Sequence, residues 1–338
     1  MNRERFAPVA YLILTATLLA VMVLCVCVGS VDVPLEETLA AFFGGEVTPN
    51  RTIILTVRLP RVLCVALCGA SLALCGAAMQ GLLRNPLADG STLGVSSGAA
   101  LGAVLALAFG ISIPGLPYAG TMGMAMVFAF GSLALILMLA WLLDRSLATH
   151  SIILIGVIFS MFASSMTNLV ISFAGEKVKS ITFWTMGSLS GSNYEYAAIL
   201  AGALLVCGGI ILLNARELNA FAVGEENARH VGVNVRRVKL TVMIAVSVLI
   251  GVCVSVGGTI AFVGLVTPHM ARLIVGPNHK RLLPASLFSG AIFLLLADLA
   301  ARTILRPKQL SIGVVTSLVG AVAFVLILRA RRGRRYEA

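Results

Sequence analysis

The longest uncharged stretch of the chain lies between Asp89 and Asp144 and contains no Asp, Glu, Lys or Arg. A transmembrane helix needs about 20 apolar residues, so this stretch is too long for a single span. The segment IPGLP, Ile113–Pro117, divides it, because proline and glycine interrupt helices. Two membrane-spanning helices are therefore expected here.

The composition of the whole chain agrees with this expectation. Of the 338 residues, 59% are hydrophobic and 12% are charged, whereas soluble domains are roughly 45–50% apolar and about 25% charged. Too few polar residues remain to cover a soluble core. The predicted fold class is an all-α integral membrane protein, with one domain over residues 1–338.

Ten spans are predicted when each uncharged run is compared with the length of one span. The run Leu240–Ala271 is too long for one and is divided near GGTIAFVG. External loops are expected at about residues 29–58 and 175–196. In the second, the polar segment Ser180–Tyr194 is expected to hold a short helix. The remaining spans are predicted at Ala10–Val28, Val62–Leu83, Ser151–Ala174, Ala197–Ala215, Leu282–Ala301 and Gln309–Leu328.

The net charge of +11 is carried largely by short connectors and by the C-terminal tail RARRGRRYEA. Basic residues beside hydrophobic helices mark the cytoplasmic side and attract anionic lipid. With ten spans, most of the 25 Lys and Arg residues fall on the side of the two termini. Both termini are predicted to be cytoplasmic, and nucleic-acid binding is not expected.

Glycine and proline recur at one offset that indicates an internal repeat. Because span two and span seven run in opposite directions, the repeat is predicted to be inverted and to relate spans 2–5 to spans 7–10. Inverted repeats are common in transporters. The matching positions, each 182 residues apart, are Gly69 with Gly251, Gly76 with Gly258, and Pro86 with Pro268.

The chain contains no recognisable signature of enzymatic chemistry. Its seven cysteines lie in apolar runs without zinc or redox spacing, so neither a metal site nor a cofactor is expected. No H-E-x-x-H or G-x-S-x-G motif occurs. No lysine stands in a Gly-Lys-Ser/Thr motif, so ATP hydrolysis would have to take place on another chain.

Two charged features remain to be interpreted. Asp298 and Arg302 lie four residues apart on one predicted helix and can pair, either to fix helix packing or to leave Arg302 facing a partner. The large cytoplasmic loop Asn214–Lys239 is either a solvated connector or a pair of short helices that binds another protein, with Gly232 ending the first helix.

Seven motifs in order, from about Val57 to Leu328, resemble the FecCD-type permeases. These are membrane subunits of ABC importers for iron-siderophore complexes, haem and vitamin B12. The motifs are VRLPRVL, GASLALCGAAMQGLLRNPLADGSTLGVSSGAALGA, WTMGSLSG, VGEENARHVGVNV, IAFVGLVTPHMARLIVG, HKRLLPASLFSGAIFLLLADLAAR and LSIGVVTSLVGAVAF.

The resemblance implies a multi-pass protein of the bacterial inner membrane that pairs with a second copy or with a similar permease. It further implies two cytoplasmic ATPase subunits and an extracytoplasmic substrate-binding protein as partners. The expected cargo is a ferric siderophore or a similar bulky iron chelate, with haem and cobalamin as alternatives. The other classes left open are an ion-coupled secondary transporter and an intramembrane hydrolase.

The resemblance also implies roles for three groups of residues. Outward arginines would receive carboxylates of the binding protein, a loop helix would dock on the ATPase, and two turns would form the cytoplasmic gate and pathway. The matching positions are Arg58, Arg61 and Arg302 for docking, Gly224, Glu225, Arg229 and Gly232 for coupling, and Gln80, Asn85, Leu87, Thr149 and His150 for the gate.

Three positions depart from the family pattern, and at one of them Val322 stands where the relatives commonly have Pro. The relatives commonly have Glu where Gln309 stands, and a small hydroxyl residue where His150 stands. A histidine at the gate can change charge between about pH 5 and 8.

Overall fold

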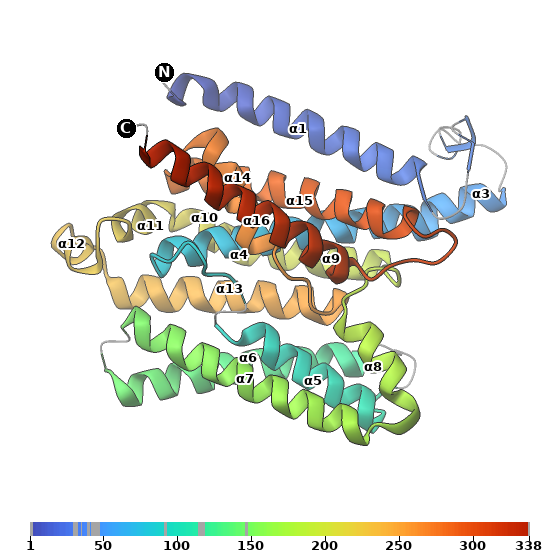
Figure 1. Cartoon of the computed structure of the whole chain (residues 1–338), viewed down its shortest axis with the longest axis horizontal. Coiled ribbons are helices and arrows are strands. Elements are labelled where there is room, and N and C mark those ends of the chain that lie inside the picture. The colour runs from blue at the N-terminus through green and yellow to red at the C-terminus, as the bar shows by residue number, and fades with distance from the viewer. Residues whose placement is uncertain are drawn as a thin grey trace.

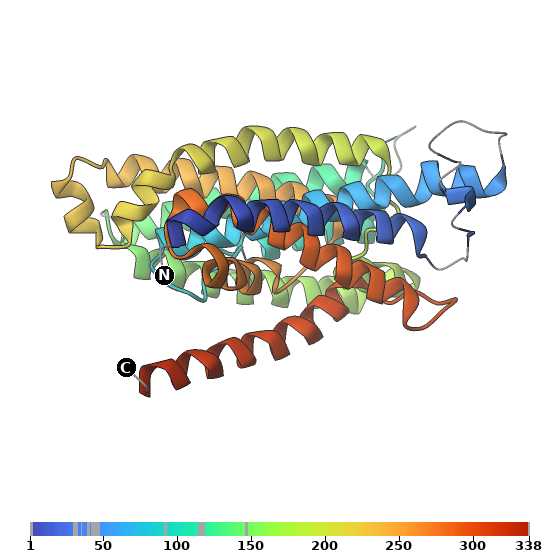
Figure 2. The ribbon, with the colours of Figure 1, turned by 90° about the horizontal axis from the view of Figure 1, so that it is seen from above.

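The structure is a computed structural model that describes residues 3–29, 33–34, 36–38, 41, 48–90, 93–113, 119–145 and 148–336. Within these residues the chain is a bundle of helices that run side by side (Figures 1 and 2). The predicted all-α fold is confirmed. Both ends of the chain lie at the end of the bundle from which α11 and α12 project, whereas α3 and α8 lie at the opposite end (Figure 1).

Seven described helices are long and apolar enough to cross a membrane, and three shorter ones are apolar. The long candidate spans lie in α1 (Arg3–Cys27), α3 to α4 (Pro49–Leu82), α6 (Ala119–Leu143), α7 (Thr149–Phe173), α9 to α10 (Tyr194–Leu213), α13 (Val235–Gly257) and α15 (His279–Thr303). The shorter apolar helices are α5 (Val95–Phe109), α14 (Val263–Val275) and α16 (Ile312–Tyr336), the last over Ile312–Ile327. Ten helices thus occupy the predicted positions, while ten spans stay a prediction.

The two long uncharged runs are divided as the sequence predicts. α5 and α6 separate around IPGLP, of which residues 114–117 lie outside the described part. α13 ends at Gly257 and α14 begins at Val263. Gly258 between them has a φ of +68°, which favours glycine. The predicted short helix in Ser180–Tyr194 is confirmed by α8 (Val178–Thr185).

The first predicted external loop, about residues 29–58, requires a correction. Residues 49–58 are helical: α3 (Pro49–Thr52) continues through the π-helical segment Ile53–Arg58 into α4 (Leu59–Leu82). Thr48 caps this helix by accepting the N–H of Arg51, and Pro49 stands in the first turn, where its missing N–H is tolerated. Residues 30–32, 35, 39–40 and 42–47 of the predicted loop are outside the described part.

Close contact between backbones holds α4 at the centre of the bundle. Gly69 of α4 lies against the carbonyl of Gly290 in α15, and Gly76 of α4 lies against the carbonyl of Gly264 in α14. A Cβ at Gly69 or Gly76 would overlap these carbonyls. Small residues permit such approach between membrane helices. The inverted repeat itself stays a prediction.

Candidate functional site

The segment expected to couple to an ATPase forms two short helices, α11 (Ala215–Phe221) and α12 (Glu225–His230). The prediction of a helix pair in this loop is confirmed, although α13 already begins at Val235. Gly224, with a φ of +125°, turns the chain into α12. Gly232, with a φ of +86°, donates its N–H to the Arg229 carbonyl at 2.9 Å just beyond the end of α12. The sequence predicts that Gly232 ends the first helix of the pair, but it follows the second, because α11 already ends at Phe221.

Glu225 connects this helix pair to two other helices. Its Oε1 accepts a hydrogen bond from the Thr149 hydroxyl at 2.7 Å and lies 2.7 Å from Lys239 Nζ. Thr149 begins α7, and Lys239 lies in the second turn of α13 with its side chain 2% exposed. One carboxylate oxygen therefore joins a predicted coupling residue to a predicted gate residue.

The environment of Glu225 favours its charged form. Partial burial raises the pKa of the carboxyl group. The hydrogen bonds from Lys239 and Thr149 and the positive charges of Lys239 and Arg229 lower this pKa by more than burial raises it, so the net shift is downward. The carboxylate is therefore ionised at neutral pH and can hold the ammonium group of Lys239.

Two of the predicted gate residues and two of the predicted coupling residues also line one pocket. Thr149 and His150 lie on its α7 side, and Gly224 and Glu225 lie on its α12 side. Arg84, which follows the last turn of α4, completes the wall. Sequence reasoning assigned the two groups separate roles, and the structure brings them into contact.

The end of α4 is held by a chain of polar contacts. The side-chain amide of Gln80 donates to the carbonyls of Gly264 and Leu265, both at 3.3 Å, and its oxygen accepts from Arg272 at 3.2 Å. Arg272 lies 3.3 Å from His269 Nδ1, and His269 Nε2 lies 3.0 Å from the Pro86 carbonyl. These contacts fix the turn after α4 against α14.

Asn85 and Leu87 both lie in that turn, Asn85 partly exposed and Leu87 exposed. The Asn85 side chain accepts the backbone N–H of Leu87 at 2.9 Å, and Leu87 is 51% exposed. Sequence reasoning missed Lys239, His269 and Arg272 as members of this region. A local signal did exist, because Lys239 and Arg272 are the charged residues that bound the uncharged run Leu240–Ala271.

The three arginines expected to face a binding protein are buried, and that expectation of exposure is wrong. Arg58, Arg61 and Arg302 are only 4%, 7% and 2% exposed. Arg58 Nη1 donates to the carbonyls of Val26 and Cys27 at 2.9 and 2.7 Å. These contacts hold the end of α1 against α4.

The other two arginines share Asp298. Arg61 donates to Asp298 Oδ1 from Nε at 3.1 Å and from Nη2 at 2.7 Å. Arg302 Nε lies 3.2 Å from Oδ2, and its Nη2 donates to the Cys25 carbonyl at 2.8 Å. The side-chain oxygen of Gln309 accepts from Arg61 Nη1 at 2.8 Å. Of the two interpretations of Asp298 and Arg302, the buried ion pair agrees with the packing role.

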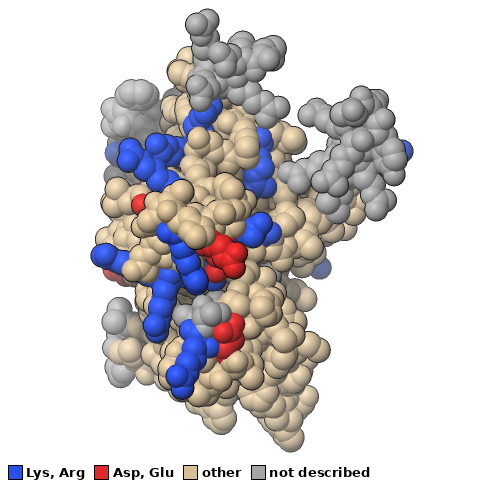
Figure 3. Space-filling view, turned by 90° about the vertical axis from the view of Figure 1, so that its left-hand side faces the viewer, with Lys and Arg blue, Asp and Glu red and all other residues tan. Residues whose placement is uncertain are grey.

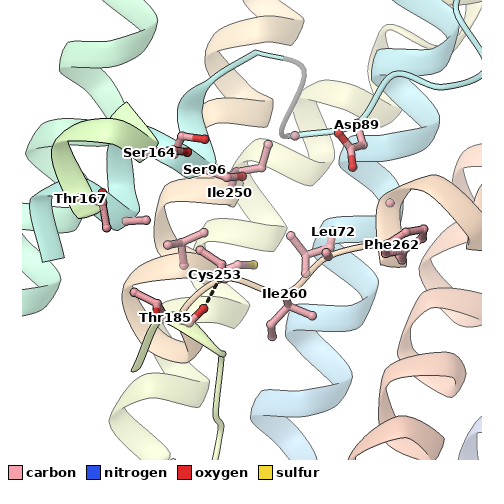
Figure 4. Close-up of a pocket in the computed structure, with 18 of the residues that line it drawn as sticks. Leu72, Asp89, Ser96, Ser164, Thr167, Thr185, Ile250, Cys253, Ile260 and Phe262 are labelled. Atoms are coloured by element: carbon pink, nitrogen blue, oxygen red, sulfur yellow. Dashed lines mark hydrogen bonds between the residues drawn. The ribbon is translucent and has the colours of Figure 1, made fainter. Parts of the chain in front are cut away.

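A pocket of about 370 Å³ lies between α4, α5, α7 and α13 and the segment that leads into α14 (Figure 4). Asp89 and Phe262 lie on one side of it, and Ser164 and Thr167 on the other. Asp89 is the one charged residue among the described lining residues. The remainder of the wall is uncharged, with apolar residues, glycines, hydroxyl groups and the amide of Asn168, so it offers a ligand few strong contacts.

Basic side chains gather at the end of the bundle that carries α12. Figure 3 shows this end, where Lys and Arg outnumber the smaller patches of Asp and Glu. Among the described residues no three His, Cys, Asp or Glu side chains are grouped as metal ligands. The exposed basic residues of the connectors at this end include Arg84, Arg145, Arg216, Arg229, Arg236, Arg237 and Lys280.

Comparison with known proteins places this arrangement in a family. The model of the FecCD transport family matches residues 17–330. The chain is 40% identical to the uncharacterized ABC transporter permease protein YvrB of Bacillus subtilis, over 99% of this chain and 97% of that protein. It is 38% identical to the molybdate import system permease protein MolB of Haemophilus influenzae, over 86% of each chain.

A solved structure agrees with the sequence comparisons. A chain assigned to a metal-chelate type ABC transporter, in an inward-facing conformation, superposes with a TM-score of 0.85. The two chains are 32% identical, and the match covers 96% of this chain and 99% of that one. This chain is therefore a member of the FecCD transport family, a multi-pass inner-membrane permease of the ABC importer type.

Proposed function

We propose that this permease carries a ferric siderophore or a similar bulky iron chelate into the cell. In this proposal two copies, or one copy and a similar permease, enclose one path. Two ATPase subunits bind at the end with α12, and a substrate-binding protein binds at the end with α3 and α8. Ten spans and two cytoplasmic termini belong to the same proposal.

The observation that carries the ATPase-driven part of this proposal is the contact between Glu225 of α12 and Thr149 of α7. α12 stands at the basic end of the bundle, which is the cytoplasmic end by the charge rule. Closure of the ATPase dimer would push α12, and Glu225 would pass that displacement to the start of α7. Rigid-body motion of this kind is a common switching mode.

The pocket wall supports a weakly bound cargo. The described lining residues include one charged side chain and several glycines, which suits a translocation path that releases its substrate. Specificity would then be set by the binding protein. The solved relative assigned to the metal-chelate type favours an iron chelate. Molybdate is a further candidate, because a 38% identical relative bears that name, at about the same identity as the relatives named for cobalamin and hemin. Haem and cobalamin remain alternatives.

Uptake by the reconstituted importer tests the choice of cargo. The permease, its ATPase and its binding protein are placed in proteoliposomes and offered ferric siderophores, haemin, cobalamin and molybdate, each labelled. The proposal predicts ATP-dependent uptake of a ferric siderophore in preference to the other three. An ATPase partner with an inactivated catalytic carboxylate is the matched control. Uptake of molybdate alone would overturn the iron-chelate assignment and leave the importer intact.

A further inference from the structure

α12 has little apolar anchorage to the rest of the bundle. Within the described part, Ala228 is the one buried side chain among its six residues. Apolar burial is the usual source of helix docking energy. The position of α12 must therefore depend on other contacts, and Glu225 supplies them at the first residue of the helix.

The buried ammonium group of Lys239 makes the Glu225 contact hard to break. Lys239 is 1% exposed, and a buried charge is costly unless an opposite charge accompanies it. Glu225 is the carboxylate at 2.7 Å, so moving α12 away would leave this ammonium group without it. The ion pair thus ties α12 to α13.

The same carboxylate oxygen holds the first residue of α7. Thr149 donates its hydroxyl to Glu225 Oε1 at 2.7 Å, and this acceptor is charged, which strengthens the hydrogen bond. α7 is weakly anchored in the described structure, because only 22% of the residues in its most apolar segment are buried. A single strong contact at its start can therefore influence where this helix end lies.

We propose that Lys239, Glu225 and Thr149 form a latch that makes the first turn of α7 follow α12. This inference rests on the proposed function and deepens it, because it names the contacts that carry displacement from the ATPase side to the gate. Lys239 and Thr149 act here as positioning residues on Glu225. Arg84, near Gly224 in the same pocket, places the turn after α4 beside the latch.

The first test replaces Thr149 with Val, which keeps the branched shape and removes the hydroxyl. Thr149→Ser, which retains a hydroxyl, is the matched variant. Amide hydrogen exchange in α12 is measured on the purified permease alone. The latch predicts exchange in α12 that is about tenfold faster in Thr149→Val, the factor expected for losing one hydrogen bond to a charged acceptor, with Thr149→Ser unchanged. Equal exchange rates in the two variants would overturn the latch.

The second test measures ATP hydrolysis and uptake in the same proteoliposomes. The latch predicts that Thr149→Val hydrolyses more ATP per substrate transported than the unaltered permease, whereas Thr149→Ser keeps the normal ratio. If Thr149 had only a structural role, Thr149→Val would lower ATP hydrolysis and uptake together and leave their ratio unchanged. That result would contradict the latch. Absence of ATP-driven uptake by the unaltered complex would instead defeat the proposed function, and the exchange measurement would still decide the latch.

Discussion

Arg61 in α4 and Asp298 in α15 lie 237 positions apart in the sequence and form a buried ion pair, with 2.7 Å between Nη2 and Oδ1. Arg302 shares the same carboxylate. Asp298→Asn would leave both guanidinium groups without this anion, and removing one partner of a buried pair costs about 3–5 kcal/mol of unfolding free energy. The expected result is a clear loss of stability in denaturation of the detergent-solubilised protein.

Lys179→Ala is the control for this variant, since Lys179 is exposed near the same end of the bundle. The comparison also decides between packing and docking for Arg61. The packing role would be refuted if Asp298→Asn and Arg61→Ala were as stable as the Lys179→Ala control and had lost only the ability to bind the substrate-binding protein.

Backbone contact between α4 and α14 gives a second prediction. In Gly76→Ala the new Cβ would overlap the Gly264 carbonyl, so the helices must separate and stability must fall. Gly131→Ala in α6 is the matched control, because nothing lies within 4 Å of its Cβ position. Alanine there is expected to be neutral or to stabilise the helix by up to about 1 kcal/mol. Equal denaturation midpoints for the two variants would contradict the close packing.

Arg229 provides the third prediction, since it is exposed on α12 and can meet carboxylates of an ATPase. Arg229→Ala is expected to raise the ATP hydrolysed per substrate transported in proteoliposomes. Arg236→Ala, which removes an exposed positive charge at the same end of the bundle, serves as the control. An unaltered ratio in Arg229→Ala would show that Arg229 does not couple the two activities.

The lowered pKa of Glu225 predicts a pH dependence. A carboxyl group whose pKa falls on folding stabilises the native state above its unfolded value, ordinarily 4.5, and this contribution is lost as pH decreases through the lowered value. At neutral pH, Glu225→Gln should therefore be less stable than the unaltered protein. Below the lowered pKa of Glu225, the stabilities of Glu225→Gln and of the unaltered protein should converge. Denaturation midpoints measured from pH 7 to 3 check this. A difference that persists unchanged at pH 3 would contradict the charged pair.

Leu87 supplies a fifth prediction because it is exposed on the turn after α4. If this turn forms the gate between two copies, a disulfide between two Leu87→Cys chains should stop transport, and reduction should restore it. Leu87→Ser, which cannot cross-link, is the control. Continued transport with the disulfide formed would remove Leu87 from the gate.

The helix pattern could be predicted because it depends on local chemistry. Asp89 and Asp144 bound one uncharged run, and proline and glycine divide it, so α5 and α6 follow from hydrophobic length alone. The helical residues 49–58 were missed because the charges of Arg51 and Arg58 suggested a loop. In the structure Arg58 stays within a helix because its guanidinium group finds carbonyl partners at the end of α1.

The contacts within the site could not be predicted in the same way. Glu225, Thr149 and Lys239 come from three separate segments, and no local pattern shows that they meet. The resemblance drew attention to Thr149 and Glu225 but gave them separate roles. The burial of Arg61 and Arg302 likewise depends on how α1, α4 and α15 pack together. The sequence interpretation placed both arginines in exposed loops and did not include this packing.

The central claim is that this chain translocates its cargo with energy from ATP hydrolysed on partner subunits. Its most direct test is uptake into proteoliposomes containing the permease with and without the ATPase, in the presence of the substrate-binding protein and internal ATP. The account predicts uptake that requires the ATPase and is abolished by vanadate. Uptake by the permease alone, driven by an ion gradient and insensitive to vanadate, would contradict it.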